Sequence, residues 1–187
     1  MASIFMSFIH EEEQVASNVK SFIPLILGHT IDTFMSSDKN AIYAGEDWMK
    51  RIFEELGTAK VLVSMLSPVS VQRPWINFEA GAAWMRDAKV IPVCFGGLPV
   101  DGLPKPYSIL QAVEIENPHG AYYLFSSIAH HLGIAPPKRP IFSHTLSDFC
   151  PEAEKSENRQ LVTKYEAFQL CLKLALKPFQ SERNPNL

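Results

Sequence analysis

One short segment restricts the possible folds of this chain more than any other. Val61–Leu66 is apolar at every position except Ser64. A strand with one face in water would instead alternate apolar and polar residues. A consecutive apolar run is typical of a strand covered on both faces, as strands in parallel sheets are. We therefore predict that Val61–Leu66 is a strand of a parallel sheet with helices on both faces.

The chain up to about residue 134 repeats this alternation of short apolar runs and longer amphipathic ones. Further strands are predicted at residues 3–9, 30–36, 89–95 and 112–115, and helices at residues 11–27, 46–56, 74–88 and 118–133. Pro24 is expected to kink the first helix or to end it early. About five strand–helix repeats joined by right-handed crossovers predict an α/β fold with a doubly wound sheet.

The remaining residues differ in composition. Four prolines between residues 136 and 151 predict a linker or an extended strap, and a last helix is expected at residues 156–176. We therefore divide the chain into one domain over residues 1–134 and a proline-rich linker with a C-terminal helix over residues 135–187. This helix either packs on the domain or mediates self-association, and both possibilities stay open.

Composition excludes several classes of function. Hydrophobic residues make up 47% of the chain and the net charge is −3, so the chain can bury a core and has no basic field for nucleic-acid phosphates. Its three widely spaced cysteines disfavour a disulfide framework or a zinc site and favour a reducing cytoplasm. No apolar run approaches the ~20 residues of a membrane-spanning helix. We expect no nucleic-acid partner, no membrane contact and no metal.

In open parallel sheets, ligands bind beyond the carboxyl ends of the strands, where the strand order reverses. If the order is 2-1-3-4-5, that point lies between the first and third strands. The residues expected there are Phe8, Ile9, His10, Ser67, Pro68 and Ser70. The helix that begins at Pro74 faces the same crevice, and its Trp75 and Glu79 are neighbours on adjacent turns. An aromatic ring beside a carboxylate predicts a pocket for a ring and a sugar.

The same helix has a second interpretation. The spacing of a core-facing stripe is also shown by Trp75, Phe78, Ala82 and Met85. On this interpretation Glu79 is a solvated surface carboxylate. The acidic residues Glu11–Glu13 are likewise most simply a solvated helix start. The chain has no glycine-rich phosphate-binding motif, so the usual dinucleotide-binding loop is not supported.

Residues 3–8, 34–38, 42–48, 61–68 and 90–93 form an ordered set along the chain. Together they resemble the strands and loops of TIR (Toll/interleukin-1 receptor-like) domains. Trp75 to Glu79 matches the WxxxE pattern of TIR domains that cleave NAD+. Residues 79–84 and 90–93 are similar to bacterial members especially. The resemblance extends to about residue 133 and does not include residues 134–187.

The resemblance implies a flavodoxin-like five-stranded parallel sheet in the order 2-1-3-4-5, and a reaction that breaks the nicotinamide–ribose bond of NAD+. It implies that Glu79 is the catalytic glutamate and that Trp75 is its aromatic neighbour. The substrate-binding residues that it implies are Phe8, Ile9, His10, Ser36 and Asp38, with residues 36–45 as the loop that shapes the pocket. The chain departs from several enzymatic relatives at Ile9 and His10, where they have an arginine or another polar residue.

Glu79 suits this chemistry because nicotinamide leaves as a neutral base, and the ribose left behind carries positive charge. A carboxylate beside that ribose stabilises the charge, and an ordinary pKa near ~4.3 would keep Glu79 ionised. NAD+ is the substrate, and no cofactor is expected. Water that reaches the ribosyl cation gives ADP-ribose, whereas a nucleophile from the folded-back substrate gives a cyclic ADP-ribose isomer.

The resemblance also implies partners. Many TIR domains are active only when assembled through TIR–TIR contacts, and some bacterial members make a cyclic product that signals to an effector during phage infection. Two other functions stay open. One is a non-catalytic TIR–TIR adaptor with residues 36–45 as its interface. The other is a different nucleoside-processing enzyme, such as a 2-deoxyribosyltransferase, which also places a glutamate beside ribose.

Overall fold

The computed structural model describes residues 4–27, 31–36, 47–116 and 118–137, and its strands form one parallel sheet. The strands are β1 (Ile4–Ser7), β2 (Thr33–Met35), β3 (Val61–Leu66), β4 (Lys89–Cys94) and β5 (Val113–Glu114). Their order is β2-β1-β3-β4-β5, so β3 lies in the middle of the sheet with all its residues buried. The predicted doubly wound fold and strand order are both confirmed.

The strand order creates a switch point between β1 and β3. The chain passes from β1 to β2 on one side and then crosses to β3 on the other side. The carboxyl ends of β1 and β3 therefore meet at the edge where ligands of such sheets bind. At this edge Ser7, the last residue of β1, is paired in register with Ser64 of β3, and both serines are buried.

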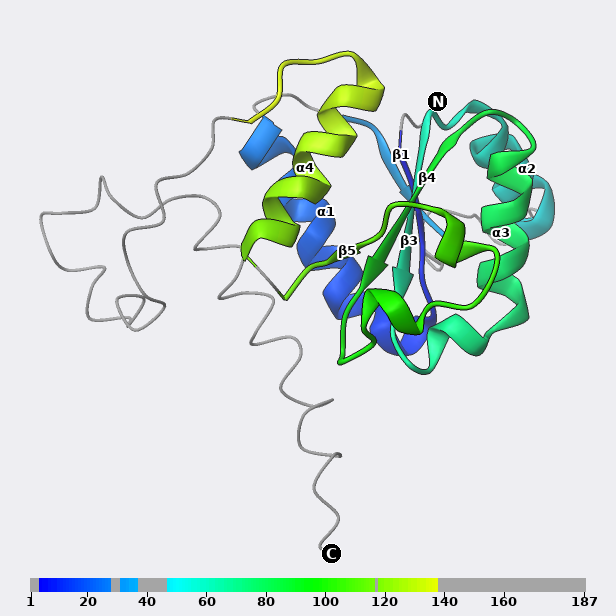
Figure 1. Ribbon diagram of the computed structural model, residues 1–187. Coiled ribbons are helices and arrows are strands. Elements are labelled where there is room, and N and C mark those ends of the chain that lie inside the picture. The colour runs from blue at the N-terminus through cyan, green and yellow to red at the C-terminus, as the bar shows by residue number, and fades with distance from the viewer. Residues whose placement is uncertain (1–3, 28–30, 37–46, 117, 138–187) are drawn as a thin grey trace, which may run out of the picture.

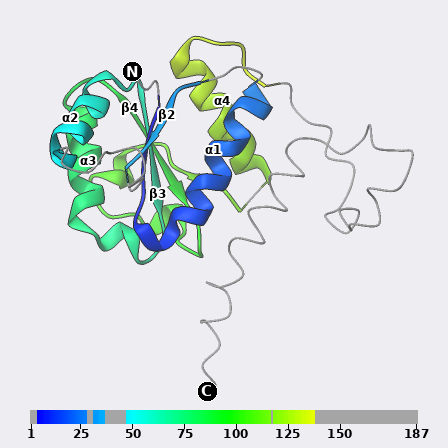
Figure 2. The same ribbon diagram turned by 180° about the vertical axis from the view of Figure 1, so that it is seen from behind.

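In the part of the chain that the structure describes, two helices cover each face of the sheet (Figure 1). The helices α1 (Glu13–Leu27) and α4 (Pro118–Leu132) pack on one face, and α2 (Trp48–Thr58) and α3 (Pro74–Trp84) pack on the other. The view from behind shows the same two pairs on opposite sides of the strands (Figure 2). Each face of the sheet therefore has an apolar core of its own.

Local sequence signals set several helix ends. Asp47 caps α2, because its side chain accepts hydrogen bonds from the backbone N–H groups of Met49 at 3.0 Å and Lys50 at 3.2 Å. Pro74 occupies the first turn of α3, as predicted. The predicted helix over residues 74–88 ends early, at Trp84. The chain turns at Asp87, which has a left-handed φ of 61°, and Ala88 then leads into β4.

The first helix ends at its predicted residue. α1 continues through Pro24 to Leu27, so Pro24 does not end the helix early, and the alternative expectation of a kink stays a prediction. Pro24 is exposed, whereas Ile23, Ile26 and Leu27 are buried in the core below α1. Burial of this apolar stripe outweighs the backbone hydrogen bond that a proline cannot make.

The predicted linker and last helix lie mostly outside the described residues, which end at Pro137. The division of the chain at residues 134 and 135 therefore stays a prediction. Among the helices that the structure describes, none has the length and apolar character needed to cross a membrane.

Two helical glycines make a matched test of the packing. A Cβ on Gly120 of α4 would lie 1.9 Å from the carbonyl oxygen of Glu114 at the end of β5, whereas a Cβ on Gly81 of α3 would meet nothing within 4 Å. We expect Gly120→Ala to lower the free energy of unfolding by about 2 kcal/mol or more. Gly81→Ala should instead raise it by up to ~1 kcal/mol through helix propensity.

Urea unfolding followed by circular dichroism measures both effects. Equal stabilities of the two variants would show that α4 does not approach β5 this closely.

Candidate active site

The helix α3 places Glu79 against the sheet. The residues of α3 that are buried are Ile76, Glu79, Ala80 and Ala83. This stripe is offset from the predicted one, in which Phe78 and Met85 were core residues; their side chains are 44% and 87% exposed. The small side chains of Ala80 and Ala83 allow α3 to lie close to the sheet. Glu79 therefore faces inward with an exposed fraction of 0%, and the alternative that it is a solvated carboxylate is wrong.

Both carboxylate oxygens of Glu79 accept hydrogen bonds. The Ser7 hydroxyl donates to Oε2 at 2.5 Å, and the Trp75 indole Nε1–H donates to Oε1 at 2.9 Å. Ser7 comes from the end of β1, and Trp75 comes from the preceding turn of α3. The predicted neighbours Trp75 and Glu79 are thus in contact, and the contact lies at the carboxyl end of β1.

The Trp75 indole contacts two other aromatic rings. It stacks on Trp48 of α2 with ring centroids 5.1 Å apart and an interplanar angle of 28°. It also stacks on Phe78, at 5.1 Å and with an angle of 29°. Trp75 is half-buried, so the indole that bonds to the fully buried Glu79 keeps part of its own surface exposed. Trp48 thus supports the indole that donates to Glu79, and we call the rings of Trp48, Trp75 and Phe78 the aromatic cover.

A second buried polar group lies beside Ser7. The Ser64 hydroxyl and the Tyr107 hydroxyl are 3.1 Å apart, and the Tyr107 hydroxyl donates to the carbonyl oxygen of Ile76 at 3.1 Å. Tyr107 lies between β4 and β5 and is fully buried. It could not be predicted from the sequence, because neither periodicity nor a motif distinguishes a core tyrosine in a segment rich in glycine and proline.

Burial changes the acidity of Glu79. Removal of water from around the carboxylate raises the pKa of Glu79 to about 7, and the hydrogen bonds from Ser7 and Trp75 oppose this rise. The expectation of an ordinary pKa is therefore wrong. At neutral pH the free protein contains both the protonated and the ionised form of Glu79.

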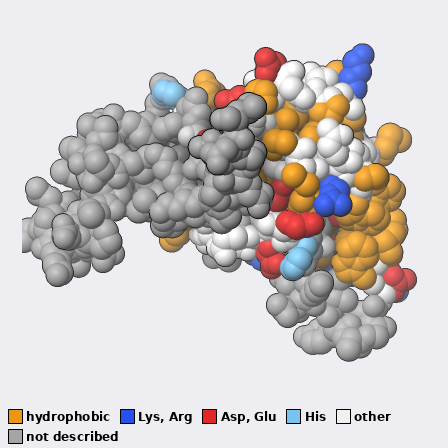
Figure 3. Space-filling view, turned by 90° about the horizontal axis from the view of Figure 1, so that it is seen from below, with side chains coloured by type: hydrophobic (Ala, Val, Ile, Leu, Met, Phe, Trp, Pro, Cys, Tyr) orange, Lys and Arg blue, Asp and Glu red, His pale blue; other side chains and the backbone are white. Residues whose placement is uncertain are grey.

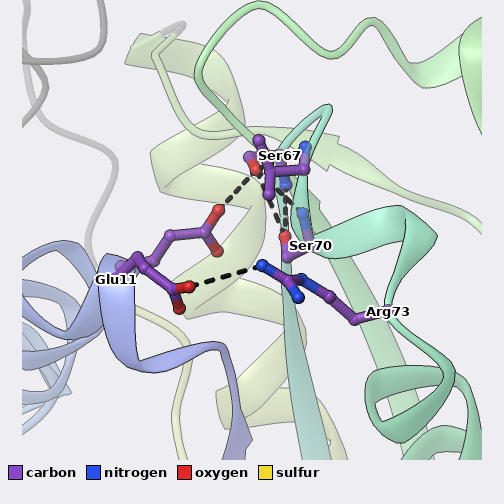
Figure 4. A network of polar contacts seen from close by, with 6 residues as sticks. Glu11, Ser67, Ser70 and Arg73 are labelled. Atoms are coloured by element: carbon purple, nitrogen blue, oxygen red, sulfur yellow. Dashed lines mark hydrogen bonds and ion pairs between the residues drawn. The ribbon is translucent and has the colours of Figure 1, made fainter.

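Glu12 is a second buried carboxylate at the switch point. It accepts a hydrogen bond from the hydroxyl of Ser67, which follows β3, and burial raises the pKa of Glu12 to about 7 against the effect of the Ser67 and Ser70 hydroxyls. Figure 4 shows these two serines beside the ion pair of Glu11 with Arg73. The interpretation of residues 11–13 as a solvated helix start is wrong for Glu12, whose orientation depends on its contact with a distant strand.

The structure brings together only part of the predicted substrate-binding set. Phe8 is buried, and its backbone N–H donates to the Ser36 hydroxyl at 3.4 Å, which joins the ends of β1 and β2. Ile9 is half-buried. His10 is exposed, and its Nδ1 lies 3.3 Å from the Glu13 carboxylate. Asp38 lies outside the described residues, as do residues 37–46 of the predicted loop.

Large apolar side chains gather on the outer surface of α2 and α3 (Figure 3). We call this the aromatic surface; its members are Trp48, Phe53, Phe78, Trp84 and Met85, all of them exposed. The surface continues from the ring stack over Trp75, because Phe53 packs edge-on against Phe78 at 5.9 Å. An exposed apolar surface of this kind is typical of an interaction site.

A cavity of about 720 Å³ lies elsewhere, beside β4, β5 and α4. Its lining includes Lys89, Glu114 and His131 but none of the residues that surround Glu79. Among the described residues, then, the buried carboxylate and this cavity belong to different parts of the molecule.

The fold and this site define a doubly wound α/β domain with a buried carboxylate at the end of its first strand. A family model described as "TIR domain" matches residues 4–121. The match includes more than half of the chain, which therefore belongs to the TIR domain family. A comparison with curated proteins found no match.

Two solved structures are similar in fold. A metazoan TIR-STING receptor from C. gigas in complex with 2',3'-cGAMP is 20% identical with a TM-score of 0.52, and the match covers 71% of this chain and 39% of that one. A second structure of a metazoan TIR-STING receptor from C. gigas is 18% identical with a TM-score of 0.50, covering 75% and 42%. The chain thus spans about two fifths of those chains, and at these identities the likeness concerns the fold alone.

The raised pKa values predict how stability depends on pH. The folded state holds the protons of Glu79 and Glu12 up to about pH 7, so their contribution to stability is fully present below the unfolded pKa and is lost as the pH rises through 7. We expect Glu79→Gln to reduce the fall in unfolding free energy between pH 5 and 8 by about 3 kcal/mol. Urea titrations at several pH values measure this difference.

The exposed Glu54 provides the control, because Glu54→Gln should follow the wild-type pH dependence. If Glu79→Gln also followed it, Glu79 would titrate normally in the folded protein.

Proposed function

We propose that this protein cleaves the nicotinamide–ribose bond of NAD+, as bacterial TIR domains of the NAD-cleaving type do. The observation that carries the proposal is the contact of Glu79 with Trp75 at the carboxyl end of β1. This is the edge at which doubly wound sheets bind nucleotides. The two residues also form the WxxxE pattern that resembles NAD-cleaving members of the family.

The reaction needs a negative charge beside the ribose. When the bond between the anomeric carbon and the ring nitrogen breaks, its electron pair leaves with nicotinamide, which becomes neutral. Positive charge develops on the ribose, and an ionised Glu79 stabilises that charge. Although burial raises the pKa of Glu79 to about 7, a cationic substrate beside the carboxylate favours its ionised form and lowers the pKa again.

Substrate access requires the aromatic cover to move. Glu79 is fully buried, and the Trp75 indole is bonded to its Oε1. We infer that Trp75 turns away from Oε1 when the dinucleotide enters and then stacks on a ring of the substrate. Its present stacking partners Trp48 and Phe78 leave it in an environment that suits a flat aromatic ligand.

The second half of the reaction decides the product. If water attacks the ribosyl cation, its oxygen bonds to the anomeric carbon, a proton is released and ADP-ribose forms. If a nucleophile of the folded-back substrate attacks first, a cyclic ADP-ribose isomer forms. We propose that such a product signals to an effector in anti-phage defence, as for the bacterial members that the sequence resembles.

Self-association is part of this proposal. The aromatic surface on α2 and α3 adjoins Trp75 through Trp48 and Phe78. A neighbouring copy that covered this surface would therefore act on the cover of Glu79. The same surface also favours a second candidate function, a non-catalytic TIR–TIR adaptor, in which the surface serves assembly alone.

Replacement of the carboxylate tests the enzymatic proposal. Incubation with NAD+ and chromatography of nicotinamide, ADP-ribose and cyclic products should show turnover by the wild-type protein. Glu79→Gln keeps the size of the side chain but removes its charge, so we expect a loss of at least ~100-fold, since oxyanion-type electrostatic contacts contribute on this scale.

Glu54→Gln, an exposed change on α2, should leave turnover unchanged. Full activity of a folded Glu79→Gln variant would overturn the proposal, and cleavage of deoxynucleosides in place of NAD+ would point to the deoxyribosyltransferase alternative. An inactive wild type that still self-associates would favour the adaptor.

The assembly requirement makes a separate prediction. Turnover per molecule should rise with protein concentration, because dilution separates the copies and leaves each site incomplete. Parallel light scattering shows whether the rise follows the formation of larger species. The same turnover per molecule in dilute monomer and in concentrated samples would contradict it.

A further inference from the structure

The two hydrogen bonds to Glu79 come from parts of the molecule that differ in their freedom to move. Trp75 is half-buried and belongs to the aromatic cover. Ser7 is fully buried and lies at the end of β1, where its pairing with Ser64 of β3 fixes the backbone. If Trp75 turns away to admit a substrate, Ser7 is the described donor that still holds the carboxylate.

From this geometry we infer that Ser7 is a positioning residue, which ties one oxygen of Glu79 to strand β1 while the other oxygen faces the substrate. This inference rests on the proposed function, because it assigns Ser7 a role at the same site. Ser7 acts through Glu79. A serine hydroxyl has a single proton, and here that proton is donated to Oε2, so the hydroxyl also selects the ionised form of the carboxyl.

The positioning role of Ser7 depends on two opposing effects on the protonation of Glu79. Burial is the largest influence on Glu79 and favours its protonated form, whereas the hydrogen bonds from Ser7 and Trp75 favour the anion. Among the described residues, Tyr107 is the titratable group whose charge interacts with that of Glu79. Burial raises the pKa of Tyr107 to about 12. Tyr107 is therefore neutral throughout the range in which Glu79 titrates.

Ser64 offers a matched control on the next strand. It is the register partner of Ser7 and is equally buried, with an exposed fraction of 0% for both. Its hydroxyl pairs with that of Tyr107 and makes no hydrogen bond to Glu79 among the described residues. Ser7→Ala and Ser64→Ala thus remove the same group from equivalent positions, and only the first removes a donor to the carboxylate.

The direct test is a titration of Glu79 that does not depend on activity. Protein labelled with ¹³C at the glutamate carboxyl carbons gives one signal per glutamate, and Glu79→Gln identifies the signal of Glu79. We expect Ser7→Ala to raise the pKa of Glu79 by about one unit or more, since a hydrogen bond to a charged group has this strength. Ser64→Ala should shift it by less than ~0.3 unit. No shift in Ser7→Ala, or equal shifts in both variants, would overturn the inference.

The pH profile of NAD+ cleavage tests the consequence for the reaction. At pH 7, Ser7→Ala should lose about fivefold in turnover or more, and part of this loss should be recovered at higher pH, where the anion forms again. Ser64→Ala should keep the wild-type profile. A profile of Ser7→Ala that is lowered equally at every pH would show a structural defect and contradict the positioning role.

The two readouts separate this inference from the proposed function. Suppose that the pKa of Glu79 shifts in Ser7→Ala but the wild-type protein leaves NAD+ intact. This result would refute the proposed reaction and still support the hydrogen bond by which Ser7 positions Glu79. An active wild type with an unshifted titration would refute the role of Ser7 alone. If Ser7→Ala does not fold, Ser7→Cys replaces it: a thiol is a weaker donor, so the pKa should still rise, and an unchanged value would overturn the inference.

Discussion

The burial of one carboxylate determines how the site of this TIR domain is built. An ionisable group without solvent needs donors that are already in place, and Glu79 receives one from the sheet and one from its own helix. The bond from Ser7 ties α3 to the end of β1. The two bonds also leave the carboxyl close to its point of titration at neutral pH, the condition in which a small change of surroundings alters its charge.

Two crossed hydrogen bonds join the strands at the switch point, because Glu12 is a second buried carboxylate there. Glu12 belongs to the turn that follows β1 and accepts from Ser67, which follows β3. Glu79 belongs to the helix that follows β3 and accepts from Ser7, at the end of β1. Each strand end is thus bonded to the element that follows the other strand. The two contacts hold together the carboxyl ends of β1 and β3, between which the ligand site of this fold lies.

The aromatic cover connects the same site to the surface of the molecule. Trp75 donates to Glu79 and stacks on Trp48 of α2, so it links α2 to the buried carboxylate. Glu79 therefore has two different partners. Ser7 is held in the sheet, whereas Trp75 is half-buried and stacks on other aromatic rings. This difference is the physical basis of our proposal that the site opens when a ligand or a neighbouring copy arrives.

The sequence by itself determined the sheet, the order of its elements and the pairing of Trp75 with Glu79. Consecutive apolar residues define buried strands, and residues four apart on a helix are neighbours whatever surrounds them. Only the tertiary structure decided which face of α3 is buried, because the stripe that begins at Trp75 and the one that begins at Ile76 have the same periodicity. The buried stripe is the one that begins at Ile76, and it includes the small residues Ala80 and Ala83. Ser7, Tyr107 and the burial of Glu12 could not be predicted, since each depends on contact between residues far apart along the chain.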